Sequence, residues 1–377
     1  MNMKQLHLAK VHRALKAQMV PFAGWEMPLQ YSSIAEEHMA VRNAVGLFDI
    51  SHMGEISVCG SGALDFLQRV ATNDVSELAI GEAHYSTILN ENGGTLDDVF
   101  VYRLGEKDYM VVANAVNMDK IHGWFKNQAK GDVELNDLTM STVMLALQGP
   151  KAQAALQKLT SFDLKTLGRF KAEFVEVAGM KVLVSRSGYT GEDGFELYLM
   201  DEQQSEPSRA EKLWNELLSA GQEFGIKPCG LGARDSLRLE AGYVLYGHEL
   251  AEYITPLEAR IGFAVKLDKG NFIGREALLR QKEKELTRAR IGLRMIEKGV
   301  PREGYKVFAD GKEAGYVTSG TLSPLLNVGI AMGYAPPSIK DANEVAIEIH
   351  GKQKATEVVE MPFYDTTKFG FGRKQVG

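Results

Sequence analysis

Residues 90–102 read NENGGTLDDVFVY and follow the alternating run HYSTILN, so two strands flank a turn rich in asparagine and glycine. Both residue types tolerate positive φ, and the segment is therefore typical of a β-hairpin. Because side chains alternate along a strand, we expect Asp98 on one face with Phe100 and Tyr102, and Asp97 on the other. From these residues alone, two explanations remain open: two solvated acids at the start of a strand, or an acid held there for function.

The pattern around this hairpin is rich in strands and irregular in order. Short apolar runs fill residues 56–114, and helices are expected near 63–70 and 118–128. Since strands and helices do not alternate regularly, the sequence favours an α+β fold with antiparallel sheets over a doubly wound fold. Near the C-terminal end, runs such as RIGLRMI and NVGIAMGYA predict a small all-β domain.

An early helix is expected in the stretch SSIAEEHMAVRNAVG. Ser33 and Glu36 form a capping-box pattern at its start. Gly46 is expected to end the helix, because glycine is the usual residue just past a helix C-terminus.

Composition narrows the class of protein. The chain has 377 residues, which predicts two or three domains at roughly 150 residues each. A net charge of -6 argues against a dedicated nucleic-acid binder, and no apolar run approaches the roughly 20 residues of a membrane span. Cys59 and Cys229 lie far apart in no metal-binding pattern, which suits a reducing cytosol, and we read no signal peptide. We therefore expect a cytoplasmic protein without nucleic-acid or membrane partners.

Several familiar active-site patterns are missing from the sequence. It contains no GxxxxGK[ST], no HExxH and no GxSxG, and GSGALD carries only the first two glycines of a dinucleotide fingerprint. The eight histidines do not cluster with acids at ligand spacing. We expect neither a tightly bound metal nor a hydrolase triad.

Three further stretches are candidates for function. SGYTGEDGFE (187–196) has glycines that allow close backbone approach to a ligand, and Glu196 follows them at the start of a strand; the alternative is a hairpin with a solvated acid. In the helix entered through CGLGARD, Arg234 lies in the turn where the helix dipole prefers an anion, so it needs an acidic partner, and Asp235 next to it is one candidate. For FAGWEMPLQY (22–31) we favour simple core packing over a ligand-binding role.

Together these stretches resemble one family, the aminomethyltransferase (T-protein) of the glycine cleavage system. FAGWEMPLQY, VGLFDISHMGE, NENGGTLDDVFVY, SGYTGEDGFE, GLGARDSLRLEAGYVLYGHEL, FIGREAL and VTSGTLSP match its pattern in order. The resemblance covers roughly residues 18–363. No single motif is decisive, but seven in sequence are highly specific.

The resemblance implies a reaction, partners and a domain plan. The expected substrates are tetrahydrofolate and the aminomethyl group on a lipoyl-bearing H-protein, and the products are 5,10-methylenetetrahydrofolate, ammonia and the dihydrolipoyl carrier. The implied fold is a three-domain cloverleaf with the folate site near its centre. We expect a folate-binding domain of residues 1–54 and 142–278, an inserted α+β domain of residues 55–141, and a C-terminal β-barrel domain of residues 286–370.

The resemblance also assigns residues to the site. Asp98 is expected to be catalytic, because a carboxylate beside the reacting folate nitrogens stabilises developing positive charge, whereas Asp97 is expected to be structural. Glu196 is expected to bind the pterin, whose ring N–H and amino group suit a carboxylate. Arg234, at the place of the family's arginine, is also expected in the folate site. Weaker expectations for that site are Tyr85, Tyr102, Asn114, Tyr189 and Tyr364.

Two other functions were weighed. A folate-binding accessory protein of the tRNA-modification and iron–sulfur class would carry a cysteine in a KGCY-type motif, but Phe272 stands at that place in KGNFIGR. A folate-coupled demethylating enzyme would need a large flavin domain, for which the chain has neither the length nor the glycine fingerprint.

Overall fold

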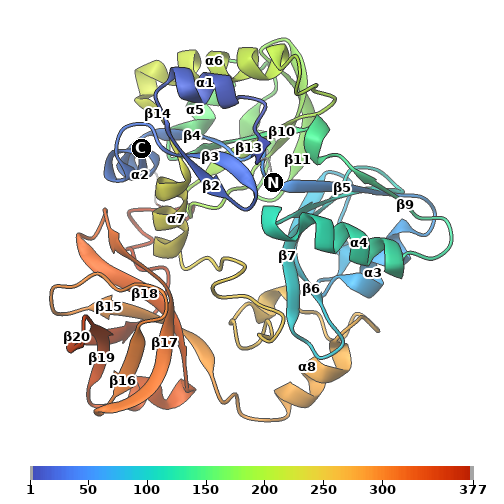
Figure 1. Ribbon diagram of the computed structural model, residues 1–377. Helices are drawn as coiled ribbons and strands as arrows, with labels where there is room; N and C mark the ends of the chain where they lie inside the picture. Colours follow the sequence, from blue (N-terminus) through green and yellow to red (C-terminus); the bar gives the residue numbers. More distant parts are fainter. Residues whose placement is uncertain (1–2, 374–377) are drawn as a thin grey trace. The chain divides into compact units, whose positions relative to one another are not determined.

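The computed structural model describes residues 3–373 (Figure 1), and the chain divides into two compact units. The first unit comprises residues 3–67, 75–85 and 99–235, and the second comprises 68–74, 86–98 and 236–373. Each is described by itself below.

A six-stranded sheet forms the centre of the first unit. Its strand order is β11-β12-β13-β10-β4-β14, and every neighbouring pair is antiparallel except β14 and β4. One face packs against helices α5 and α6, where Trp214 and Leu217 meet apolar side chains from alternate strand positions. The elements are β4 (Val45–Asp49), β10 (Val143–Gln148), β11 (Ala172–Val177), β12 (Met180–Ser185), β13 (Gly194–Leu199), β14 (Ile226–Pro228), α5 (Ala152–Gln157) and α6 (Ser208–Gly221).

The N-terminal part of the first unit forms a small three-stranded sheet. Its order is β1-β3-β2, and Trp25 and Met27 of β3 are buried against Leu6 and Ala9. Trp25 and Met27 of the stretch FAGWEMPLQY therefore serve core packing, as favoured from the sequence, whereas Phe22 is exposed. The elements are β1 (Lys4–Gln5), α1 (Ala9–Ala14), β2 (Gln18–Phe22) and β3 (Trp25–Gln30).

Helix α2 (Ile34–Asn43) begins as the sequence predicted but ends differently. The Ser33 hydroxyl accepts a hydrogen bond from the backbone N–H of Glu36, so the N-cap is confirmed. The expectation for Gly46 was wrong: the helix ends before Ala44, and Gly46 lies inside β4. A Cβ at Gly46 would lie 2.4 Å from a methyl carbon of Val41, so close packing is what requires glycine there.

A second sheet has the order β6-β7-β8-β5-β9, and β5 pairs antiparallel with β8 and β9, as β7 does with β8. Helices α3 and α4 contact each other through Phe66 and Phe125, whose rings meet edge to face with 5.3 Å between ring centres. Strand β7 passes from the second unit into the first. The elements are β5 (Gly54–Cys59), α3 (Ala63–Val70), β6 (Glu82–Leu89), β7 (Thr95–Arg103), β8 (Asp108–Ala113), α4 (Met118–Gln128) and β9 (Glu134–Asp137).

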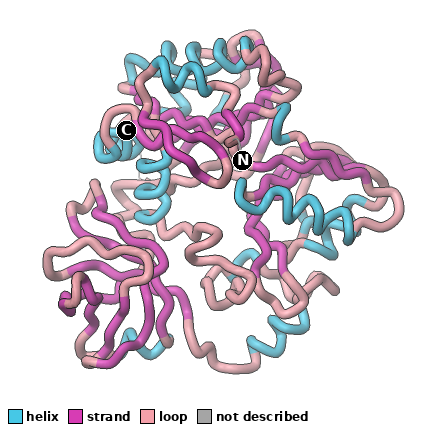
Figure 2. The backbone as a smooth tube through the Cα atoms, in the orientation of Figure 1, coloured by secondary structure: helices cyan, strands magenta, loops and turns pink. Residues whose placement is uncertain are grey.

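The second unit contains a closed barrel with the order β15-β18-β17-β16-β19-β20, drawn from orange to red in Figure 1 and as strands in Figure 2. Leu293, Val317 and Ile347 are fully buried in its core, because inward and outward side chains alternate along each strand. The elements of this unit include α7 (Leu231–Glu240, entering from the first unit), α8 (Arg275–Lys282), β15 (Ala289–Met295), β16 (Lys306–Ala309), β17 (Lys312–Ser323), β18 (Val328–Ala335), β19 (Val345–Ile349) and β20 (Lys352–Val359).

The predicted fold class is confirmed: the chain mixes helices with largely antiparallel sheets and has a C-terminal β-barrel. The residue boundaries expected for three domains remain predictions. Within residues 3–373, no helix is both long and apolar enough to cross a membrane.

Candidate functional site

Glu196 lies on the face of the six-stranded sheet that points away from α5 and α6. Along β13, Phe195 and Leu197 enter the core beside Trp214. Strand alternation therefore turns Glu196 and Tyr198 to the opposite face. The carboxyl group of Glu196 and the phenol of Tyr198 therefore lie on the same face of the sheet, the one that α5 and α6 do not cover.

Strand register brings small residues next to this acid. Glu196 pairs with Ala146 on β10 and with Ser185 on β12. Alanine adds little bulk beside the carboxylate, whereas serine brings a hydroxyl to the same face. The neighbourhood of Glu196 is thus assembled from three adjacent strands, of which β12 and β13 are consecutive and β10 is distant in sequence.

A series of hydrogen-bonded hydroxyl groups leads away from Glu196. Its Oε2 accepts a hydrogen bond from Ser187 Oγ at 2.5 Å, and Ser187 Oγ lies 2.9 Å from Ser185 Oγ. Tyr102 donates to Ser185 Oγ at 3.2 Å, and its hydroxyl lies 3.1 Å from that of Tyr198. Tyr102 and Tyr198 are almost completely buried, so the series runs from the interior to the carboxylate.

Two opposing effects act on the Glu196 carboxyl. Burial raises its pKa above the ordinary value, whereas the hydrogen bond from Ser187 and the positive charge of Arg234 lower it. Glu196 nevertheless retains some exposure to solvent. It is therefore a sheltered but accessible carboxylate, a suitable partner for a ligand that offers N–H donors.

Arg234 has an aromatic partner. Its guanidinium lies over the ring of Tyr189, 4.6 Å from the ring centre, which is a cation–π contact. Asp235 is exposed to solvent. The structure thus brings together Glu196, Arg234, Tyr189 and Tyr102, four of the residues expected from the sequence.

Two buried side chains, Arg42 and Gln148, hold the glycine-rich loop that carries Tyr189 by hydrogen bonds. Arg42 donates to the carbonyl oxygen of Thr190 at 2.9 Å and to Glu192 Oε1 at 3.1 Å, and the Arg42–Glu192 ion pair is fully buried. Gln148 accepts a hydrogen bond from the Thr190 hydroxyl at 2.8 Å and donates to the carbonyl of Ser187 at 3.0 Å. The loop conformation is therefore set by the sheet and by α2.

Sequence reasoning missed these anchors. Arginine is a residue typical of surfaces, and no local pattern marks Arg42 as one of the buried residues of α2. The glycine at position 188 is the clearer sequence signal. A Cβ there would lie 1.9 Å from Gln148 Oε1, so the packing of Gln148 requires glycine. A bidentate pair between Arg186 and Asp193, at 3.0 and 2.6 Å, closes the loop at its base.

His52 is a second residue that sequence reasoning missed. It is buried, and its Nδ1 has no hydrogen-bond partner within residues 3–373. Burial and the positive charge of Arg234 lower its pKa to about 3, so the ring is neutral at physiological pH. The positive charge in this part of the site therefore comes from Arg234.

Aromatic side chains cluster beside Tyr102. Phe100 lies 5.8 Å from Tyr102, 6.4 Å from Tyr85 and 5.3 Å from Phe170, measured between ring centres. Tyr85 and Phe100 retain exposure, whereas Tyr102 is 0% exposed. The Tyr85 ring is therefore partly accessible, whereas the buried Tyr102 contributes to the site through the hydrogen bonds of its hydroxyl. Phe170 was not expected from the sequence.

The two remaining weak candidates lie at the ends of elements. Asn114 precedes the short helix η2 (Ala115–Asn117) and is half-buried. Tyr364 is 7% exposed and follows Phe363, whose backbone N–H donates to the carbonyl of Glu240. Their expected contact with folate remains a prediction.

The hairpin has the turn and the strand phase predicted from its sequence. Asn90 Oδ1 accepts hydrogen bonds from two backbone N–H groups of the turn, and Gly93 has a φ of 82°. Along β7, Asp97 is completely buried, whereas Asp98 retains exposure. Of the two neighbouring acids, Asp98 is the more accessible to solvent.

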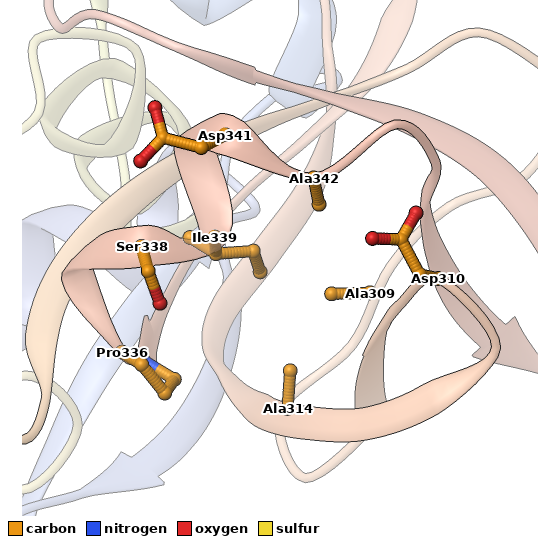
Figure 3. A pocket seen from close by; sticks show the side chains of 8 residues that line it. All are labelled: Ala309, Asp310, Ala314, Pro336, Ser338, Ile339, Asp341 and Ala342. Carbon is orange, nitrogen blue, oxygen red and sulfur yellow. The ribbon is translucent and has the colours of Figure 1, made fainter.

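The barrel has a hollow of its own, about 230 Å³ in volume, shown with its lining residues in Figure 3. It lies beside the short helix η7 (Pro337–Asp341), and alanine, proline and isoleucine make up much of its lining. Asp310 accepts hydrogen bonds from the backbone N–H groups of Asn343 and Glu344, both at 3.1 Å. Small volume and an engaged acid make this hollow a poor fit for a folate-sized ligand.

Known proteins resemble the chain over nearly its whole length. The family described as "GCVT N-terminal domain" matches residues 8–269, and the "Glycine cleavage T-protein C-terminal barrel domain" matches residues 288–365. An aminomethyltransferase of Geobacillus kaustophilus is 50% identical over 370 residues, covering 97% of this chain and 100% of that protein. A probable aminomethyltransferase of Pyrococcus horikoshii is 45% identical over 400 residues, covering 98% and 99%.

A solved structure agrees with these relatives. The crystal structure of glycine cleavage system aminomethyltransferase T from Bartonella henselae matches with a TM-score of 0.89 and 37% identity, covering 98% of this chain and 99% of that one. The resemblance inferred from seven sequence motifs is thereby confirmed. The chain belongs to the aminomethyltransferase, or T-protein, family of the glycine cleavage system.

Proposed function

We propose that this chain transfers the one-carbon unit of an aminomethyl group to tetrahydrofolate. The donor is the aminomethyl group on the lipoyl arm of H-protein, and the products are 5,10-methylenetetrahydrofolate, ammonia and dihydrolipoyl H-protein. The observation that carries this proposal is similarity to aminomethyltransferases along both complete chains, at 50% identity for the relative from Geobacillus kaustophilus. A shared fold alone would not identify the activity, but close similarity along the whole chain does support it.

The proposed pterin contact is the Glu196 carboxylate. A pterin offers a ring N–H and an adjacent amino group, and one carboxylate accepts hydrogen bonds from both. Among the described residues, Ser187 is the only hydrogen-bond donor to Glu196, so the carboxylate retains capacity to accept more. Arg234, held over Tyr189, provides positive charge and a flat surface in the same neighbourhood.

Asp98 is the proposed catalytic residue. When the aminomethyl sulfide loses ammonia, the one-carbon unit left on sulfur becomes electron-poor and iminium-like, and a nearby carboxylate stabilises that positive charge. The folate nitrogens then bond to this carbon, and its bond to sulfur breaks to give the dihydrolipoyl thiol. The same carboxylate can orient the attacking folate nitrogen. The exposure of Asp98, in contrast to the burial of Asp97, supports this assignment.

Supporting roles in folate binding are proposed for the remaining residues. Tyr85 and Tyr189 are exposed enough to provide aromatic walls. Asn114 and Tyr364 are proposed polar contacts. Tyr102 acts on the ligand only through other groups, because its ring is fully buried.

The test is ammonia release from aminomethylated H-protein, measured with and without tetrahydrofolate. Rapid release that depends on folate, together with equal formation of methylenetetrahydrofolate, is the expected result. Folate binding without ammonia release would contradict the proposal and would favour an accessory role.

The structure favours a structural role for the stretch that would distinguish an accessory protein. Phe272, at the place of the accessory family's cysteine, is buried with Leu89 and Leu278. The Lys269 ammonium donates to the backbone carbonyl of Ala71 and to two further carbonyls of that segment. These contacts hold a turn in place and present no reactive group.

A reducing compartment such as the cytoplasm is the proposed location. Cys59 and Cys229 are both unpaired, and Cys229 is buried. The chain thus has no described disulfide to maintain within residues 3–373, which suits a compartment that keeps thiols reduced.

A further inference from the structure

The hydroxyl groups behind Glu196 form one connected hydroxyl chain. An ionised carboxylate only accepts hydrogen bonds, so Ser187 donates to Glu196. Ser187 Oγ is also directed as a donor at Ser185 Oγ, 2.9 Å away, so Glu196 and Ser185 compete for its single hydroxyl proton. Tyr102 donates to Ser185, which leaves the Tyr102 oxygen to accept from Tyr198.

Ser185 accepts from both Tyr102 and Ser187. The donation from Tyr102 occupies one of the two acceptor sites of Ser185 and so favours donation of the Ser187 proton to Glu196. The hydroxyl chain links Tyr198, Tyr102, Ser185, Ser187 and finally Glu196. Hydrogen bonds in such a chain polarise one another, and those that end on an ionised group are stronger than neutral ones.

We propose that this hydroxyl chain is a positioning device, in which Ser187, Ser185, Tyr102 and Tyr198 hold Glu196 ionised and oriented to accept two N–H groups of the pterin. This inference rests on the proposed function, because it assigns the pterin to Glu196. The four hydroxyl residues touch the carboxylate or one another and are not catalytic residues.

The surroundings of the hydroxyl chain favour protonated phenols and an ionised Glu196. Burial raises the pKa of both Tyr102 and Tyr198, so both phenols keep their protons in the neutral range and remain donors. Arg234 from α7 is the charged group that favours ionised Glu196. Glu55 from β5 lies near Tyr198, but burial raises the pKa of Glu55 well above its ordinary value and so favours its neutral form.

An ionised carboxylate matters for the proposed ligand. Burial alone raises the pKa of Glu196, and a protonated acid would offer one good acceptor oxygen instead of two. The hydrogen bond from Ser187 opposes this effect of burial. Removing that hydroxyl should shift the balance toward the protonated acid.

The experiment measures tetrahydrofolate affinity by calorimetry across pH for the full-length wild type, Ser187→Ala, Tyr102→Phe and Glu196→Gln. In Ser187→Ala, we expect affinity near neutral pH to fall by about tenfold or more, and the acid-side loss of affinity to begin about one pH unit higher. Tyr102→Phe should also lower the affinity and move the acid-side loss to higher pH, but by less than Ser187→Ala, because Tyr102 acts on Glu196 through two serines. Ionisation of the ligand itself is common to all variants, so differences between them report on the protein.

Tyr109→Phe is the matched control. Tyr109 is also a buried tyrosine, on neighbouring β8, but its hydroxyl has no hydrogen-bond partner within residues 3–373. Its removal should leave affinity and pH dependence unchanged. If Ser187→Ala fails to fold, Tyr102→Phe against this control carries the same test.

The possible failures are distinguishable. If Glu196→Gln binds tetrahydrofolate as tightly as wild type, or the wild type does not bind it, the proposed pterin contact is wrong. If Glu196→Gln binds weakly but Ser187→Ala and Tyr102→Phe keep the wild-type pH dependence, only the positioning role is overturned. An effect of Tyr109→Phe equal to that of Tyr102→Phe would also overturn it.

Discussion

Replacing Arg42 by methionine should destabilise the protein strongly, although Arg42 lies in a helix beneath the site. Its side chain and that of Glu192 are both fully buried, with 3.1 Å between Arg42 Nη1 and Glu192 Oε1. At an effective dielectric constant of about 20, two unit charges at this separation attract by about 5 kcal/mol. Arg42→Met leaves the Glu192 charge buried without its guanidinium, so we expect a loss of about 3–5 kcal/mol in the free energy of unfolding.

The double variant Arg42→Met with Glu192→Met separates this cause from simple loss of packing. It removes both buried charges, so it should regain much of the stability lost in the single variant. Urea denaturation, followed by fluorescence and circular dichroism, would measure all variants. Lys158→Met, which breaks an exposed pair with Glu223, is the control and should change stability little.

The same variants should also affect ligand binding. Arg42 holds the carbonyl of Thr190, next to Tyr189, so losing it should loosen the loop and weaken tetrahydrofolate binding. The reasoning would be refuted if Arg42→Met lost less than about 1 kcal/mol, or if the double variant were as unstable as the sum of both single variants.

Three further changes have defined outcomes. Asp98→Asn is nearly isosteric and removes the charge, so single-turnover transfer should fall greatly while tetrahydrofolate affinity measured by calorimetry stays close to wild type; normal turnover would exclude the catalytic role. Gly94→Ala would put a Cβ 1.8 Å from the carbonyl oxygen of Glu252 and should lower the urea midpoint of unfolding markedly. Gly123→Ala is the control, because Gly123 is helical with nothing within 4 Å, and it should raise the free energy of unfolding by about 0.5–1 kcal/mol. Equal urea midpoints for the two variants would contradict the close approach at Gly94. Burial opposes ionisation of Asp49, but hydrogen bonds from a buried histidine and a serine outweigh burial and lower the pKa of Asp49 below 3.8. The ionised Asp49 therefore contributes to stability above pH 3.8, and this contribution is lost as the pH falls below that value. The stability difference between wild type and Asp49→Asn should therefore shrink below about pH 4, and a difference that grows in acid would show the opposite shift.

Local patterns determined much of what could be predicted. The asparagine–glycine turn and the alternation after it predicted the hairpin and put Asp97 and Asp98 on opposite faces. Only the structure showed that Asp97 lies on the buried face. Turn chemistry and strand periodicity act over a few residues, so the hairpin and its alternation are readable without tertiary structure. The N-cap at Ser33 was readable for the same reason, whereas Gly46 was misread because its requirement comes from a packed side chain.

Tertiary structure alone decided how the site around Glu196 is assembled. Register between β10, β12 and β13 sets Ala146 and Ser185 beside this acid, and Tyr102 reaches the hydroxyl chain from another sheet. The Arg42–Glu192 pair joins residues 150 positions apart. No local pattern encodes such contacts, because each depends on which strands pair and on what their shared face must bury or hydrogen-bond. The sequence thus determined the kind of protein and its candidate acids, whereas folding determined which hydroxyls and charges accompany them.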